Sequence, residues 1–113
     1  MSDEEGGESV HGSMNDTKWD ELRLAMYAIR PAPKWRTKDV HSGFTSPWDG
    51  EWYYHFRDGG YDSIEFVEIR AEDPQHLDSI VASLRAIHVP GVIEGDVVTV
   101  YGHIEPGEAV DWI

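Results

Sequence analysis

The sequence has 113 residues and a formal net charge of −13, from 22 acidic and 9 basic side chains. This length suits one domain with a modest core, and the absence of cysteine excludes disulfides, a thiolate nucleophile and a cysteine-based zinc site. So acidic a chain is expected to repel nucleic acid and anionic membranes and to attract basic proteins.

Residues 1–13 combine acids, glycine and serine with one valine, too little apolar surface to offset the entropy of ordering. They are predicted to be a disordered acidic tail before a single domain at 14–113, which leaves open that Met14 is the natural start. The tail lacks the basic start and apolar middle of a signal peptide. No apolar run approaches the roughly 20 residues of a membrane span, so the sequence predicts a cytoplasmic protein.

Charge is distributed unevenly along the rest of the chain. Residues 18–38 hold six bases against two acids, whereas residues 39–113 hold fifteen acids against three bases. The basic stretch at 30–38 could bind an anion, but we expect its side chains to pair with the acidic half. The acidic half is the stronger functional signal, because distributed carboxylates steer a basic partner toward the surface.

The segment 17–30 is predicted to be a helix. Thr17 with Asp20 forms a near capping box, and Pro31 ends the helix. Its apolar side chains recur at helical spacing: Trp19, Leu22, Met26 and Ile29. The following segment, 34–40, alternates as a short edge-like strand, and 41–50 is predicted to be loop and turn because it carries glycine and proline.

A hairpin is predicted between strands at 51–57 and 62–70, joined across Asp58-Gly59-Gly60. A three-residue loop best separates apolar from polar side chains. In that register Trp52 pairs with Phe66 and Tyr54 with Ile64 on the core face. The opposite face is then polar.

That polar face of the hairpin places Tyr53 and His55 against Glu65 and Ser63. Val67 and Ile69 also fall on it, so a bulge near Phe66 or a partial cover is needed.

A second helix follows Asp73-Pro74, an N-cap with proline at the first helical position. It carries the stripe Leu77, Ile80, Val81, Leu84 and Ile87. A final strand is predicted at 97–104, with a short arm at 92–93 left open, and Trp112 is expected to pack back onto the domain. The order α-β-β-β-α-β defines a small α+β fold, a mainly antiparallel sheet with two helices on one face. The expected core is Trp19, Leu22, Met26, Trp52, Tyr54, Ile64, Phe66, Leu77, Ile80, Val81, Leu84, Val98 and Val100.

No catalytic residue, metal-ligand set or cofactor is predicted. The six histidines form no metal-like pair on one helix or strand face, so a metal site could only be assembled by folding, for instance from His55, His103 and Glu65. The serines lack a G-x-S-x-G context. Asp58-Gly59-Gly60 is followed by no helix start and no lysine, which indicates a turn rather than a phosphate cradle. An acid pair of the glycosidase kind is not expected in so short a chain.

The one dense aromatic cluster is the run 48–54, WDGEWYY. The hairpin register does not explain Trp48, in a turn, or Tyr53, on the polar face. Exposed aromatics ringed by carboxylates are typical of a surface that binds a basic protein. The predicted partner-binding residues are Trp48, Asp49, Glu51, Tyr53, Asp58, Asp62 and Glu65. The alternative is that Trp48 folds over the sheet edge and Tyr53 keeps only its hydroxyl in water.

Four segments together resemble a family of small bacterial proteins of unknown function: NDTKWDEL at 15–22, KWR at 34–36, WDGEWYY at 48–54 and IEFVEI at 64–69. The resemblance extends over most of 14–104, and its motifs are aromatic and structural rather than catalytic. It implies a bacterial, cytoplasmic, single-domain protein and brings no functional residues. More loosely, small acidic α+β proteins are similar to toxin-neutralising immunity proteins in charge and size alone.

Three functions remain open from the sequence. The first is an acidic protein-binding module, inhibitor-like or immunity-like, whose acidic sheet face engages a basic partner. The second is a small-molecule binder or enzyme with a pocket between helix and sheet near Trp35, Trp48 and His55. The third is an accessory protein that dimerises through the edge strand or through Val67 and Ile69.

Overall fold

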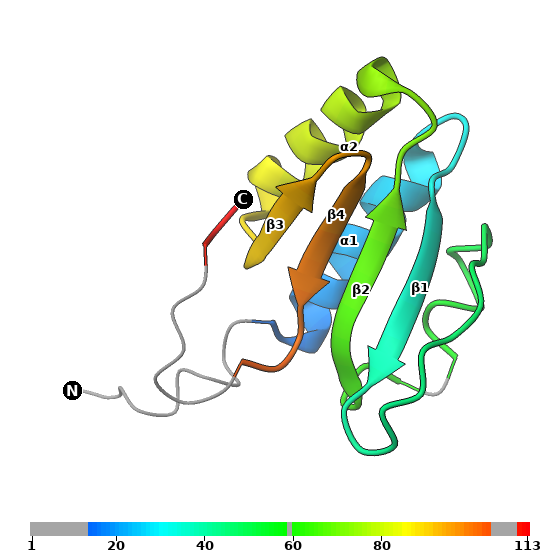
Figure 1. The fold of residues 1–113 in the computed structure, drawn as a ribbon, viewed down its shortest axis with the longest axis vertical. Coiled ribbons are helices and arrows are strands. Elements are labelled where there is room, and N and C mark those ends of the chain that lie inside the picture. Colours follow the sequence, from blue (N-terminus) through cyan, green and yellow to red (C-terminus); the bar gives the residue numbers. More distant parts are fainter. Residues whose placement is uncertain (1–13, 59, 105–110) are drawn as a thin grey trace.

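The computed structural model describes residues 14–58, 60–104 and 111–113, so the predicted tail at 1–13 lies outside the described residues. Two helices cover one face of a four-stranded antiparallel sheet, whose strand order is β1-β2-β4-β3 (Figure 1). The elements are α1 (Asp16–Ala28), β1 (Lys34–Asp39), β2 (Ile64–Arg70), α2 (Pro74–Ile87), β3 (Gly91–Glu94) and β4 (Val97–Tyr101). The α+β class, the antiparallel sheet and the placement of both helices on one face are confirmed.

Helix α1 begins at Asp16, one residue before the predicted start, so the cap is not at Thr17. Asn15 is the N-cap, and its side chain accepts a hydrogen bond of 2.8 Å from the backbone N–H of Lys18. Trp19, Leu22 and Met26 are buried against the sheet, as the helical spacing predicts. The helix therefore presents one apolar face to the core and leaves Leu24 and Tyr27 exposed on its outer side.

Helix α2 begins where its sequence predicts. Asp73 caps the N-terminus by accepting a hydrogen bond of 2.7 Å from the backbone N–H of His76. At the other end His88 adopts a left-handed conformation (φ 67°), and its N–H bonds to the carbonyl of Leu84. Ile80 and Leu84 are fully buried, and α2 packs beside α1.

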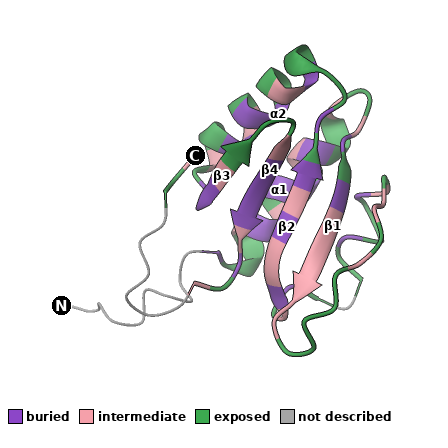
Figure 2. Cartoon of the chain, in the orientation of Figure 1, coloured by how far each residue is buried: buried purple, intermediate pink, exposed green. Residues whose placement is uncertain are grey.

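Strand β2 pairs with β1 on one side and with β4 on the other. Val67 and Ile69 face the helices and are fully buried, as are Val98 and Val100 of β4 (Figure 2). The alternation of a strand then directs Glu68 and Arg70 to the open face. The predicted bulge near Phe66 is present, because the β1–β2 register shifts between the pairs Lys38–Phe66 and Asp39–Ile64. Val67 and Ile69 therefore lie on the buried face together with Ile64, and not on a polar face.

The strand predicted at 51–57 is also wrong. Residues 52–58 form a compact turn, in which the N–H of Asp58 bonds to the carbonyl of Tyr54. Because β1 and β4 occupy both edges of β2, no position remains for a strand at 51–57. The short arm left open at 92–93 is instead a full strand, β3.

The turn nevertheless supplies two core side chains. Trp52 is 1% exposed, and its indole N–H donates a hydrogen bond of 2.9 Å to the carbonyl of Pro33. Phe56 packs on Trp52 and edge-on against Trp35, with ring centroids 4.9 and 5.1 Å away. The predicted core is confirmed except at Tyr54, which is 65% exposed, and at Phe66 and Leu77, which are half-buried.

Residues 44–49 run along the outer edge of β1. Trp35 and Asp49 exchange two backbone hydrogen bonds of 2.8 Å, and the N–H of Ser46 donates to the carbonyl of Thr37. This contact covers the edge of β1 and removes it as a template for another strand. Since Val67 and Ile69 are buried as well, neither surface is available for the predicted dimer.

Candidate protein-binding surface

Glu51 determines the shape of the turn at 52–58. Its carboxylate accepts hydrogen bonds of 2.7–3.0 Å from the backbone N–H groups of Tyr53, Tyr54 and His55. These bonds, led by that of His55, hold the pKa of Glu51 below its usual value although partial burial opposes them. The Glu51 carboxylate thus accepts the hydrogen bonds that a neighbouring strand would otherwise accept, and residues 52–58 form a turn instead of a strand.

Asp49 supports the same turn from its other end. Its carboxylate accepts from the N–H of Glu51 at 2.8 Å and contacts the imidazole Nδ1 of His55 at 2.9 Å. Burial alone would raise the pKa of Asp49, but these two hydrogen bonds outweigh it and lower the pKa. Conversely, the hydrogen-bonded carboxylate of Asp49 raises the pKa of His55.

Arg23 of α1 fixes the position of Tyr53. The arginine is only 5% exposed, and its guanidinium donates a hydrogen bond of 2.7 Å to the carbonyl of Tyr53. The same guanidinium lies 5.0 Å from the Tyr53 ring centroid, a cation–π distance. Asp20 balances the buried charge at 3.4 Å. Tyr53 is therefore held rigidly on the outer side of α1.

Three tyrosines meet at this position. Tyr53 lies between Tyr27 of α1 and Tyr54, with ring centroids 5.3 and 4.9 Å away. Their exposed fractions are 38% for Tyr53, 44% for Tyr27 and 65% for Tyr54, and Leu24, one turn before Tyr27, is 46% exposed. We call Leu24, Tyr27, Tyr53 and Tyr54 the tyrosine patch. It combines three accessible aromatic rings with one exposed leucine side chain.

Carboxylates border the tyrosine patch. Glu21 is exposed three residues before Leu24 on α1, and Asp58 is exposed at the end of the turn that carries Tyr54. Asp20 is half-buried between Arg23 and the hydroxyl of Tyr61, which donates a hydrogen bond of 2.5 Å to it. Burial and this hydrogen bond raise the pKa of Tyr61 to about 12. Arg30 also lies at this border, 5.8 Å from the ring centroid of Tyr27, so the aromatic centre is bordered by carboxylates and by one guanidinium.

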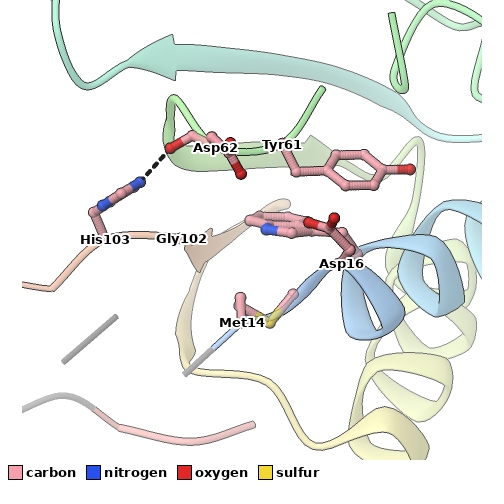
Figure 3. Close-up of a pocket in the computed structure, with 7 residues that line it drawn as sticks. Met14, Asp16, Tyr61, Asp62, Gly102 and His103 are labelled. Atoms are coloured by element: carbon pink, nitrogen blue, oxygen red, sulfur yellow. Dashed lines mark hydrogen bonds between the residues drawn. The ribbon is translucent and has the colours of Figure 1, made fainter. Parts of the chain in front are cut away.

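Asp20 also links the tyrosine patch to a small pocket at the start of α1. The pocket has a volume of about 240 Å³, and Figure 3 shows Asp16 and Asp62 on its walls. The remaining lining residues are Met14, Trp19, Tyr61, Gly102 and His103. A side chain at position 102 would overlap the carbonyl oxygen of Ile64 and approach Trp19, so glycine is required there. This pocket lies apart from the position near Trp35, Trp48 and His55 that the second interpretation expects.

The predicted partner-binding residues do not form one surface. Glu51, Tyr53 and Asp58 belong to the turn at the tyrosine patch, with Asp49 beneath them. Asp62 lines the pocket, where its carbonyl contacts His103 at 2.6 Å.

The other two predicted residues lie on the open face of the sheet. Trp48 contacts Arg36 and Arg70 there, and Glu65 pairs with Lys38 at 3.7 Å. The expectation that the acids gather around both Trp48 and Tyr53 is therefore wrong.

Sequence reasoning missed two residues of the tyrosine patch and misassigned a third. Leu24 and Tyr27 lie on α1 outside the buried stripe of Trp19, Leu22 and Met26. Two large apolar residues on the polar side of a helix were a readable signal for an exposed patch. Tyr54 was assigned to the core because the hairpin register required it.

The residues that the sequence offers for a metal site, His55, His103 and Glu65, each contact a different partner. His55 contacts Asp49, His103 contacts the carbonyl of Asp62, and Glu65 pairs with Lys38. Within residues 14–58, 60–104 and 111–113, no three histidine, aspartate or glutamate side chains are arranged to hold a metal ion. None of the helices that the structure describes has the length and apolar character of a membrane span.

The site and the fold define a small α+β protein with an exposed aromatic surface. The chain belongs to a family of unknown function, DUF6678, whose model matches residues 1–107. This confirms the resemblance to a family without an assigned activity. No curated protein and no solved structure matches the sequence.

Proposed function

We propose that this protein is an acidic protein-binding module, inhibitor-like or immunity-like, that engages a basic protein through the tyrosine patch. The observation that carries the proposal is the exposure of three tyrosines whose rings pack on one another, with Tyr53 held in place by a buried arginine. Tyrosine is enriched at protein interfaces, where it buries a large area at low cost in side-chain entropy. Pre-ordered rings lower that cost further.

The charge of the molecule supports a basic partner. Only Asp20, Glu65 and Glu68 form ion pairs with lysine or arginine among the residues that the structure describes. The other carboxylates there are not neutralised in this way, and Glu21 and Asp58 border the tyrosine patch. Such charges accelerate encounter with a basic surface and disfavour acidic proteins. The absence of cysteine suits a reducing compartment, so we place this activity in the cytoplasm.

Affinity capture tests the proposal. The immobilised chain is exposed to a lysate of its source organism, and each captured protein is quantified by mass spectrometry and then purified for kinetics. We expect a basic protein whose capture is lost with Tyr54→Ala. Phe44→Ala is the matched control, because Phe44 is also a 65% exposed aromatic but lies outside the patch.

Kinetics with the purified partner separate the contribution of the tyrosine patch, seen in dissociation, from that of the acidic charge, seen in association. Tyr54→Ala should raise the dissociation rate about tenfold, as for a hot-spot residue, and leave the association rate little changed. Added salt should slow association. Capture of the same proteins by wild type and Tyr54→Ala, or capture of an acidic partner, would contradict the proposal.

A further inference from the structure

The open face of the sheet carries a second feature, which is basic. Side chains on this face alternate with the buried ones, so β1 contributes Lys34, Arg36 and Lys38, and β2 contributes Glu68 and Arg70. Figure 1 views the sheet from the side that the helices leave uncovered. In a chain with 22 acids and 9 bases, four of the bases thus lie on two neighbouring strands. This is the reverse of the acidic sheet face that the sequence suggests.

Trp48 lies at the centre of this group. Its ring centroid is 4.6 Å from the guanidinium carbon of Arg36 and 4.5 Å from that of Arg70. Lys34 is directly opposite Arg70 across the strand pair, and its side-chain stem passes Gly50, two residues after Trp48. The indole therefore contacts two guanidinium groups, and Lys34 is the cross-strand neighbour of one of them.

These cations are only partly neutralised. Arg36 pairs with Glu68, Nε to Oε1 at 2.5 Å. Lys34 and Arg70 are exposed and form no ion pair with another described residue. Like charges directly opposite each other in a sheet are destabilising. Three cations against one carboxylate leave about two positive charges in a molecule that has an excess of acids to neutralise them.

We propose that Lys34, Arg36, Arg70 and Trp48 form a binding site for a small phosphate-bearing ligand. A phosphate monoester carries a charge of about −1.5 to −2 at neutral pH, which matches the charge that these side chains leave uncompensated. Guanidinium groups stacked on a ring keep edge N–H donors suited to phosphate oxygens. The indole can pack against the rest of the ligand.

The size of the ligand follows from the range of electrostatic forces. At physiological ionic strength the Debye length is about 8 Å. A small anion at the site therefore experiences mainly the local positive charge. A long polyanion such as nucleic acid would also meet the net −13 of the chain and be repelled.

The phosphate site differs from the tyrosine patch in location, since it lies on the open face of the sheet, and in charge, since it is basic.

An NMR titration tests the site. The full chain is titrated with inorganic phosphate and, in parallel, with phenyl phosphate, malonate and chloride at constant ionic strength. The signals followed are the indole N–H of Trp48 and the Nε–H groups of Arg36 and Arg70. We expect saturable shifts with both phosphates, tighter with the phenyl ester, and none with chloride.

Variants make the result specific. Arg70→Gln should weaken phosphate binding roughly tenfold, the usual loss for one charged hydrogen bond. Arg70→Lys keeps the charge and should weaken binding less than Arg70→Gln does. Arg57→Gln removes the same charge from the exposed turn and should leave binding unchanged. Absence of saturation, equal weakening by Arg57→Gln, or malonate binding as tightly as phosphate would overturn the proposal.

Discussion

The molecule has two regions that contribute to one core: the helix–sheet body, made of the two helices and four strands, and the connection at 40–63 between β1 and β2. The two regions are ordered by different interactions. The body is stabilised by repeating backbone hydrogen bonds and by apolar stripes with helical or strand periodicity. In the connection, side chains bond the backbone. Asp39, Asp49 and Glu51 each accept from backbone N–H groups two to four residues away.

The difference shows where exposed functional side chains can be held in order. A periodic element buries one face and presents its exposed side chains at fixed spacing, as α1 does with Leu24 and Tyr27. The connection is anchored in the core by Trp52 and Phe56, while the three residues between them, Tyr53, Tyr54 and His55, remain accessible. An irregular loop on a rigid scaffold is a common location for binding residues.

Truncation of Trp52 should have the largest effect on stability. Trp52→Ala removes a 1% exposed indole and its hydrogen bond to Pro33, so we expect a loss of about 3–5 kcal/mol in the free energy of unfolding. Denaturant unfolding measures it. Trp52→Phe retains most of the packing and should cost less. A loss below about 1 kcal/mol for Trp52→Ala would mean that the connection is peripheral to the core.

Leu84 tests the body in the same assay. Leu84→Ala deletes a fully buried side chain of α2 and should cost about 2–5 kcal/mol. Leu24→Ala is the matched control, since that leucine is 46% exposed on α1, and it should change stability by no more than about 0.5 kcal/mol. If the two leucine variants unfold alike, α2 does not cover the sheet as described.

The body was predictable from sequence because its elements are periodic. The stripes of α1 and α2, the N-cap of α2 and the strands at 34–40 and 97–104 all follow from spacing and local chemistry. Strand partners did not follow, because period-2 alternation fits any partner strand. The run 51–57 alternates as well as β2 does, and only the tertiary competition of β1 and β4 for β2 excludes it.

The tyrosine patch was predicted only in part for the same reason. Tyr53 was identified as unexplained by core packing, whereas Tyr54 was assigned to the core of a hairpin that does not form. The turn depends on three hydrogen bonds to one carboxylate, Glu51. That pattern has no periodic signature in the sequence. Long-range partners such as Arg23 and Tyr53, 30 residues apart, are likewise invisible to local patterns.

Glu51 provides the test of how the connection is ordered. Glu51→Ala should cost about 1 kcal/mol, as for loss of a capping residue, and Glu51→Gln less, because the amide oxygen still accepts. The lowered pKa of Glu51 means that this contribution is present above the ordinary value of 4.5 and is lost as pH falls through the folded value. Unfolding at pH 7 and pH 3 measures both effects. An equal loss at both pH values would show that the carboxylate charge is not what orders the turn.

His55 should give the smallest effect, with the opposite dependence on pH. Its pKa is raised in the folded chain by the hydrogen-bonded Asp49, so protonated His55 favours the folded turn. Its contribution is complete below the ordinary pKa of 6.5 and is lost as pH rises through the folded value. The stability difference between wild type and His55→Gln should therefore shrink with rising pH above 6.5, whereas the difference for Glu51 stays constant there.

Because the His55 ring is solvent-exposed, screening keeps this change in stability small. An NMR titration of the His55 ring is the sharper measurement. Asp49→Asn should return that pKa toward 6.5. If Asp49→Asn leaves the pKa of the His55 ring unchanged, the contact between Asp49 and His55 does not help to order the connection. The hydrogen bonds of Glu51 would then be the main interactions that order it.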